Sequence, residues 1–518
     1  MSRTLFRHPH IVTGAPEAPR TSALLVEDGV IVAVGDDAVA AAGRVTVVDL
    51  PGEAVLPGLH DAHIHSEWLA RDLAGVDLRA ARSLDDALRR LGEHARGLPP
   101  GQRIDSGRWD SNRWRPPAVP DRHSLDRVVA DRVVTLPSVD GHTAWVNTAA
   151  LRAAGITRDT PDPVGGEVVR DAHGEPTGIL RENAIALLDA LPEASSPLRP
   201  LLERAQDLLL SVGLTSITDL DGEDTRAAYA AMHADGRLRI RVHKGIQAAD
   251  LDRAVAQGRR AGQGDALLSV GPVKFFSDGA LGSHTAHMSE PLAGHASCGV
   301  AVTPYPVLLE RIRYAVDAGL DVCTHAIGDE ANRLVLDAYE VVRAAGSEAL
   351  LRVEHAQHVR PTDIARFARL GVIASMQPSH ATADCELAEA LLGDRPVASY
   401  AWRAMLDAGV AVAFGSDAPV EDPNPFLGLH AAVTRQRADG FPPGGWQPAE
   451  RISLDEAVAA YTVGAAEAVG RLDVGRLAVG QRADLIAVDR DPWRVDPPAL
   501  RDTQVLQTVV GGEPALPR

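Results

Sequence analysis

The chain has 518 residues, of which 45% are hydrophobic and 24% charged, so it can bury a large core and is not disordered. A formal net charge of -18, without a cluster of Lys and Arg, disfavours nucleic acids and anionic membranes as partners. The start of the sequence lacks the apolar run of a secretory signal, no stretch is apolar for long enough to span a membrane, and three cysteines without a CxxC pair indicate reduced thiols. We therefore expect a cytoplasmic protein.

The two ends of the chain are predicted to form one small β-sandwich. Residues 24–49 contain short apolar runs, with Asp28-Gly29 placed as a hairpin turn between two of them. Near the other end, ADLIAVDRDPW and TQVLQTVVGG also contain short apolar runs typical of strands. We assign residues 1–58 and 473–518 to this sandwich and residues 59–472 to a larger central unit.

The central unit is predicted to be an α/β barrel. Short β-rich runs alternate with longer helical segments, the pattern of βα units around a parallel sheet. Eight strands can be counted, and this number fits a closed (β/α)8 TIM-like barrel. The strands are AVLPGL ending at Leu59, and runs near 214–220, 238–243, 269–276, 320–325, 350–355, 372–377 and 410–417.

The gap between the first and second strands, about 76–205, is far longer than a βα connection and is predicted to be a subdomain inserted over the barrel mouth. Trp109, Trp114, Trp145 and His142 would offer flat apolar area and polar tips to a substrate. Together with Glu182 in GILREN, His142 is also a candidate for orienting the scissile group. Core packing of the tryptophans, a loop hydrogen bond of His142 and a surface charge at Glu182 are the structural alternatives.

The strongest local motif is PGLHDAHIH, in which His63 and His65 stand two residues apart. Both side chains leave the same face of an extended segment, so two imidazoles could share one metal ion. The spacing alone is weak evidence, because His8 and His10 repeat it in the N-terminal β unit. Neighbouring His60 is interpreted as a bystander.

Other candidate ligands recur where predicted barrel strands end. His325 in CTHAIGD, His355 in RVEHAQ and Asp417 in FGSDAPV all stand at such points, and barrel active sites are built there. Imidazole and carboxylate are ligands of zinc and similar divalent ions, and catalytic sites keep one coordination position open for water. Four histidines and one aspartate are enough for two ions that share a bridging ligand.

Lys274 in PVKFF stands near the end of the fourth predicted strand, as the other candidate ligands stand near the ends of theirs. Of 52 basic residues only Lys244 and Lys274 are lysines, which favours a need for a primary amine. An ammonium beside two dications would be strongly repelled, whereas carboxylation by carbon dioxide would turn the side chain into an anionic bridge. A surface or salt-bridged lysine is the structural alternative, and Lys244 has the weaker case for chemistry.

In order along the chain, PGLHDAHIH, VKFFSDGALGS, HAIGD, EHAQ, QPSH and GSDAPV, with GRWDSNRW and DGHTAWVN in the insertion, resemble the amidohydrolase superfamily. The resemblance is to its amidohydrolase-3 branch, which includes N-substituted formamide deformylase-like enzymes, and it spans nearly the whole chain. It implies a distorted barrel with a composite β-sandwich. It also implies a binuclear metal centre, with zinc as the expected metal, formed by His63, His65, carboxylated Lys274, His325, His355 and Asp417.

The functional hypothesis is hydrolysis of a non-peptide carbon–nitrogen bond in a small amide-type molecule. A metal-activated hydroxide would attack the amide carbon, with Asp417 as general base and then general acid. A deaminase or cyclic-amide hydrolase using the same site is an alternative. A binding or regulatory protein with a relict metal site would be expected to have lost ligands, whereas all six positions are filled. The sequence leaves open the substrate, the native metal, one or two ions, and homo-oligomer formation.

Overall fold

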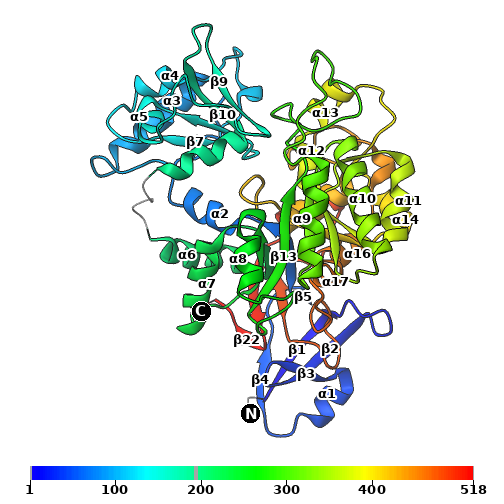
Figure 1. Cartoon of the computed structure of the whole chain (residues 1–518). Coiled ribbons are helices and arrows are strands. Elements are labelled where there is room, and N and C mark those ends of the chain that lie inside the picture. Colours follow the sequence, from blue (N-terminus) through cyan, green and yellow to red (C-terminus); the bar gives the residue numbers. More distant parts are fainter. Residues whose placement is uncertain (1–2, 192–196, 517–518) are drawn as a thin grey trace.

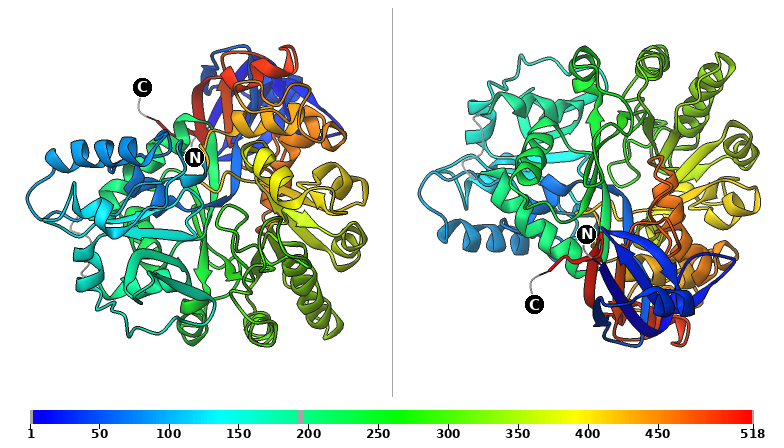
Figure 2. Two further views of the ribbon diagram at one scale, coloured as in Figure 1. Left: turned by 90° about the horizontal axis from the view of Figure 1, so that it is seen from above. Right: turned by 90° about the horizontal axis from the view of Figure 1, so that it is seen from below.

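The computed structural model describes residues 3–191 and 197–516. Figure 1 shows a central barrel, a sheet built from both chain ends below it, and the insertion above it. In Figure 2 the insertion, in cyan, lies on the side of the barrel opposite the yellow-green helices. The distant ends of the chain therefore meet on one side of the barrel and the insertion lies on the other.

The composite sheet joins the chain ends in the order β22-β21-β20-β5-β1-β2-β3, with β4 also paired to β1. The predicted hairpin turn is confirmed between β2 and β3, because Asp28 (φ 47°) and Gly29 (φ 81°) both adopt the left-handed conformation that such a turn needs. The elements are β1 (Arg3–Val12), β2 (Arg20–Glu27), β3 (Val30–Val34), α1 (Gly35–Ala41), β4 (Thr46–Asp49), β5 (Ala54–Pro57), β20 (Leu485–Val488), η5 (Pro497–Asp502), β21 (Val505–Val510) and β22 (Glu513–Pro514).

Eight parallel strands form the barrel, in the order β19-β17-β15-β14-β13-β12-β11-β6, which confirms the predicted (β/α)8 class. Between the two end strands, backbone hydrogen bonds from Asp417 N to His63 O (2.7 Å) and from His65 N to Ala418 O (2.9 Å) complete the ring. The strands are β6 (Leu59–Ile64), β11 (Leu214–Asp219), β12 (Arg241–Gln247), β13 (Leu268–Phe276), β14 (Val322–Ala326), β15 (Leu351–His355), β17 (Val372–Met376) and β19 (Val412–Phe414).

The first barrel strand differs from the prediction, which placed it in AVLPGL. The structure divides this run at Gly58: β5 pairs antiparallel with β20 in the composite sheet, and Leu59 begins β6 in the barrel. A Cβ atom at Gly58 would lie 2.3 Å from Thr215 Oγ1, so the close approach of the chain to β11 requires glycine here. His63 consequently belongs to a barrel strand instead of following one.

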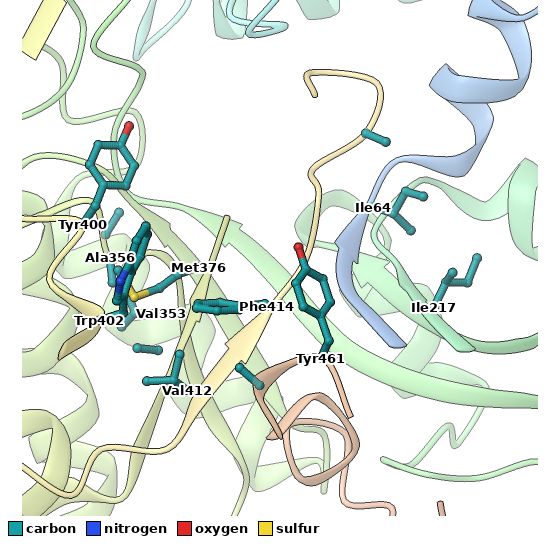
Figure 3. Close-up of a cluster of buried hydrophobic side chains, with 14 of the residues drawn as sticks. Ile64, Ile217, Val353, Ala356, Met376, Tyr400, Trp402, Val412, Phe414 and Tyr461 are labelled. Carbon is teal, nitrogen blue, oxygen red and sulfur yellow. The ribbon is translucent and has the colours of Figure 1, made fainter. Parts of the chain in front are cut away.

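Helices surround the barrel and share its core with the strands. Figure 3 shows Phe414 of β19 between Trp402 and Tyr461, with ring centroids 5.8 Å and 5.5 Å away in edge-to-face contacts. The surrounding elements are α2 (Ser66–Asp72), α6 (Leu198–Ser211), α7 (Glu223–Ala234), η3 (Ala248–Asp250), α8 (Leu251–Ala256), α9 (Tyr305–Asp317), α10 (Asp329–Ala344), β16 (His358–Val359), α11 (Pro361–Leu370), α12 (Pro378–Ala383), α13 (Cys385–Leu392), β18 (Ala398–Ser399), α14 (Trp402–Asp407), α15 (Pro425–Thr434), η4 (Pro448–Glu450), α16 (Leu454–Ala460) and α17 (Val463–Glu467).

The insertion contains a four-stranded sheet, in the order β7-β8-β10-β9, and has apolar clusters of its own. Helix α6 starts within the predicted range 76–205, but Leu202 and Leu209 pack in the barrel core. Within the described ranges, no helix is long and apolar enough to cross a lipid bilayer. The elements of the insertion are α3 (Leu84–Arg96), η1 (Ser111–Arg113), α4 (Arg122–Asp126), β7 (Thr135–Pro137), β8 (Thr143–Val146), α5 (Thr148–Ala153), β9 (Gly166–Arg170), β10 (Pro176–Glu182) and η2 (Asn183–Ala190).

Candidate functional site

The six predicted metal ligands meet at the carboxyl ends of the barrel strands, where barrel enzymes place their chemistry. They come from five strands or from the residues directly after them, and all six are buried. They line one side of a cavity of about 1260 Å³. The residues are His63, His65, Lys274, His325, His355 and Asp417.

The tightest group consists of His63, His355 and Asp417, whose ligand atoms all lie within 4.8 Å of one another. Asp417 Oδ1 is 3.3 Å from His63 Nε2 and 3.5 Å from His65 Nε2. The ring centroids of His325 and His355 are 4.6 Å apart, so the fourth imidazole adjoins the same group. These residue types at these distances can hold a divalent cation.

A strained backbone helps to aim two of these side chains. His355 (φ 71°) and Asp417 (φ 58°) both adopt the left-handed conformation, which non-glycine residues rarely use. Each stands at or just beyond the end of its strand, where the chain turns into a loop. Strained backbone conformations of this kind persist only where the surrounding structure holds them in place, and they are common at functional sites.

A buried ion pair holds the ring of His63 from behind. Glu354 Oε2 is 2.7 Å from His63 Nδ1, and the other oxygen, Oε1, accepts a hydrogen bond from Arg352 Nε at 2.8 Å. Arg352 also donates to Ala62 O (2.7 Å), so its charge is fully engaged. With Nδ1 occupied by the carboxylate, Nε2 is the nitrogen left for the centre, which is the usual arrangement behind a metal-binding histidine.

Two further rings are held in the same way. His65 Nδ1 lies 2.9 Å from Asp221 Oδ1, and His355 Nδ1 lies 2.8 Å from Gln377 Oε1. Burial lowers the pKa of His65 to about 3 and that of His355 well below its usual value. Both rings are therefore neutral near pH 7, and neutral imidazole is the form that binds metals.

His325 presents the opposite nitrogen. Its Nε2 lies 3.1 Å from the backbone oxygen of Gly279 and 3.4 Å from Asp278 Oδ1. Its Nδ1 is buried and has no hydrogen-bond partner in residues 3–191 and 197–516. A bound ion is one explanation of a buried polar atom without a partner, and this nitrogen adjoins the other candidate ligands.

Lys274 is fully buried beside the histidines. Its Nζ is 3.3 Å from His63 Nε2 and 4.8 Å from the centre of the Phe276 ring, and no carboxylate in the described part of the chain forms an ion pair with it. Burial lowers the pKa of this amine. Lys244 differs, because Asp219 Oδ1 pairs with it at 2.9 Å and gives it a structural role.

Within the insertion, His142 and Glu182 form a pair that lines the cavity. His142 Nδ1 is 2.8 Å from Glu182 Oε2, and Thr285 Oγ1 donates to Glu182 Oε1 at 2.5 Å. Burial disfavours the imidazolium, but Glu182 outweighs it and raises the pKa of His142 to about 9. The centroid of the His142 ring lies 5.2 Å from that of His325, so this imidazole adjoins the candidate metal ligands.

The predicted aromatic residues separate into two groups. Trp109 lines the cavity, although it is only 5% exposed and its Nε1 donates to Leu136 O at 2.9 Å. Trp145 is completely buried, packs against Trp114 and donates to Asp121 O. Trp145 and Trp114 both pack in the apolar core of the insertion and are not among the residues that line the cavity, so their contact with substrate stays a prediction that this packing does not support.

Sequence reasoning missed one aromatic residue on the cavity wall. Trp68 of α2 is 37% exposed and stacks on His65, with ring centroids 4.5 Å apart and planes 18° from parallel. The guanidinium of Arg108 lies 5.0 Å from its ring. Its position three residues after His65, one helical turn into α2, was the available signal.

Comparison with known proteins agrees with this geometry. Residues 46–515 match the model of the Amidohydrolase family. The protein YtcJ of Bacillus subtilis (strain 168) is 33% identical over 97% of this chain and 97% of its own, and the N-substituted formamide deformylase of Arthrobacter pascens is 32% identical over 95% and 94%. The crystal structure of an uncharacterized metal-dependent hydrolase from Pyrococcus horikoshii OT3 superposes with a TM-score of 0.79 at 28% identity, covering 96% of this chain and 99% of the other. The chain therefore belongs to the amidohydrolase family and is a hydrolase that acts on carbon–nitrogen bonds.

Proposed function

We propose that this hydrolase cleaves an amide- or formamide-type bond of a small molecule at a binuclear metal centre. The observation that carries the proposal is the convergence of four neutral imidazoles, a lysine and an aspartate on one cavity, with three of the rings held from behind by side chains. The formamide deformylase among the relatives supports this bond type. Trp68, Trp109 and the His142–Glu182 pair would form the substrate wall.

The ligands present fit divalent ions, two zinc ions in our proposal, because neutral nitrogens and one carboxylate surround a buried centre. When bound, such ions supply Lewis acidity that activates water and polarises a carbonyl oxygen. The residues that would hold them are His63, His65, Lys274, His325, His355 and Asp417.

We propose that Lys274 is carboxylated, and its surroundings support this. Within the described residues no carboxylate forms an ion pair with the buried amine, whose Nζ is 3.3 Å from His63 Nε2, and an ammonium at this place would be repelled by bound cations. Addition of carbon dioxide to the neutral amine forms a nitrogen–carbon bond and releases one proton. The side chain would then carry a negative charge and have two oxygens with which to hold the ions.

Asp417 is placed to move the proton. Its Oδ1 faces the rings of His63 and His65, while its Oδ2 faces His380 on the cavity wall. We propose that the carboxylate takes a proton from the attacking water and gives it to the departing nitrogen. The positively charged His142, whose ring adjoins that of His325, would orient the carbonyl group by hydrogen bonding.

The test combines metal analysis with hydrolysis of a panel of N-formyl and N-acyl amines. We expect about two ions per wild-type chain, and loss of both metal and activity in Lys274→Ala. His10→Asn is the matched control, because it alters the other His-X-His pair and should keep both. Circular dichroism would establish that each variant is folded.

Two outcomes would contradict the proposal in different ways. A folded wild-type chain without metal would favour a binding or regulatory protein with a relict site. A metal-loaded enzyme that releases ammonia from aminated rings, or opens cyclic amides, while leaving the panel intact would favour the deaminase or cyclic-amide hydrolase. Purified wild-type protein and both substrate sets are sufficient to decide.

A further inference from the structure

A histidine outside the predicted ligand set lies next to Asp417. His380 belongs to α12, which follows β17, and its ring is on the cavity wall with only 8% of the residue exposed. Gln377, at the start of the same helix, holds the ring of His355. One strand-to-helix turn therefore supports a ligand and brings a second imidazole to the centre.

The two oxygens of Asp417 have different neighbours. Oδ1 faces His63 Nε2 (3.3 Å) and His65 Nε2 (3.5 Å), where metal would be held. Oδ2 faces His380 Nε2 at 3.8 Å. The oxygen near His380 is thus the one that remains available to exchange a proton with the reacting groups, which is the role of a general acid–base residue.

The environment of His380 indicates that Nε2 has a function beyond packing. This atom is buried and has no hydrogen-bond partner in the described ranges of the chain. The ring lies nearly parallel to that of His355, with 11° between the planes and 6.0 Å between the centroids. A buried nitrogen left unpaired costs free energy unless another state of the site uses it.

We propose that His380 is a positioning residue: its Nε2–H donates a hydrogen bond to Asp417 Oδ2 and holds that oxygen toward the departing nitrogen of the substrate. Closing the present separation of 3.8 Å to a hydrogen bond of about 3 Å needs only a small rotation of the carboxylate. The inference rests on the proposed amide hydrolysis, because it assigns a place to the proton that leaves with the amine.

Three substitutions separate hydrogen bonding from packing. In His380→Gln the amide nitrogen reaches the place of Nε2 and keeps the donor. In His380→Asn the shorter side chain brings its amide only to the place of Nδ1. His380→Leu fills much of the volume without any donor.

The kinetic readout is the dependence on the leaving group. For an N-alkylformamide, whose amine must be protonated to depart, we expect His380→Leu to lower kcat about 100-fold with little change in KM. For N-formyl-4-nitroaniline, whose amine departs far more readily, the loss should be about fivefold or less. His380→Gln should recover most of kcat and His380→Asn should resemble His380→Leu. Equal losses on both substrates, or a glutamine variant as slow as the leucine variant, would overturn the proposal.

A second measurement does not depend on amide turnover. Crystal structures of the zinc-loaded wild type and His380→Leu should show Nε2 within about 3.2 Å of Asp417 Oδ2 in the former and a rotated carboxylate in the latter. Zinc bound to His380 Nε2, or an unchanged carboxylate in the leucine variant, would refute the positioning role. If the wild type cleaves no amide, the proposed function fails while these structures still decide the position of Oδ2.

Discussion

His8 and His10 lie in β1 of the composite sheet, whereas His63 lies in β6 of the barrel and His65 directly follows that strand, and both pairs have the same spacing in the sequence. His8 uses both ring nitrogens locally: Nε2 is 3.2 Å from Gly52 O and Nδ1 accepts from His10 N at 3.0 Å. In the barrel pair a carboxylate holds one nitrogen of each ring and the other faces Asp417. The difference teaches that the partner behind the ring, and not the spacing, makes a histidine a candidate ligand.

The largest expected effect on activity comes from changing Asp417, the carboxylate that faces His63 and His65. Asp417→Asn should lower kcat roughly 10³-fold, because the amide cannot exchange the proton, while most of the fold is retained. Steady-state kinetics and circular dichroism measure the two effects. His10→Asn is the control and should remain fully active. Turnover within tenfold of wild type in Asp417→Asn would remove this residue from the proposed mechanism.

A smaller effect should follow from weakening the partner behind His63. Glu354→Gln keeps the shape of the side chain but removes the charge that faces both His63 and Arg352. We expect metal affinity to fall about 10- to 100-fold, measured by competition with a chelator. The buried Arg352 also loses its counter-ion, so the free energy of unfolding should drop by roughly 3 kcal/mol or more. Unchanged metal affinity would show that the outer carboxylate does not prepare the ring.

Removing metal should change the thermal stability of proteins with an intact barrel site, whether or not the histidine pair of the composite sheet is altered. A ligand that binds only the folded state stabilises it by about 2.7 kcal/mol when present at 100 times its Kd. Chelation should therefore lower the thermal midpoint of the wild type and of His10→Asn by a few degrees, and should leave that of Lys274→Ala unchanged. Calorimetry with and without chelator gives the comparison. An equal shift in all three proteins would mean that the stabilising ion binds elsewhere.

The smallest effect is expected in the composite sheet. His8→Ala removes one side-chain hydrogen bond to Gly52 and the acceptor for the His10 amide, and should cost about 1 kcal/mol of unfolding free energy. Metal content and kcat should stay at wild-type values. Denaturant unfolding and elemental analysis measure both. Loss of metal in this variant would place His8 in a site that the structure does not indicate.

The strand pattern and the ends of strands predicted the barrel and the convergence of the six candidate ligands, because parallel strands bring their carboxyl ends to one edge. The pattern did not separate β5 from β6, since both are apolar and only the contact between Gly58 and Thr215 divides them. Glu354 was missed although it stands beside His355: its role depends on the ring of His63, which lies 291 residues away in the sequence. Trp145 and Trp68 could not be distinguished either, because exposure to a cavity depends on tertiary packing.

The hydrogen bonds that close the barrel have a consequence for how the enzyme is made. Asp417 N donates to His63 O and His65 N donates to Ala418 O, so the hydrogen bonds between the first and last strands involve three residues of the candidate centre. A ribosome adding about 5 to 20 residues each second must synthesise most of the chain before these partners can meet. Strand β5 can pair with β20 only after a still longer part of the chain has been synthesised, because β20 starts at Leu485. Products of interrupted translation that end before Asp417 should therefore be inert toward substrate, and metal loading should be among the last events of maturation.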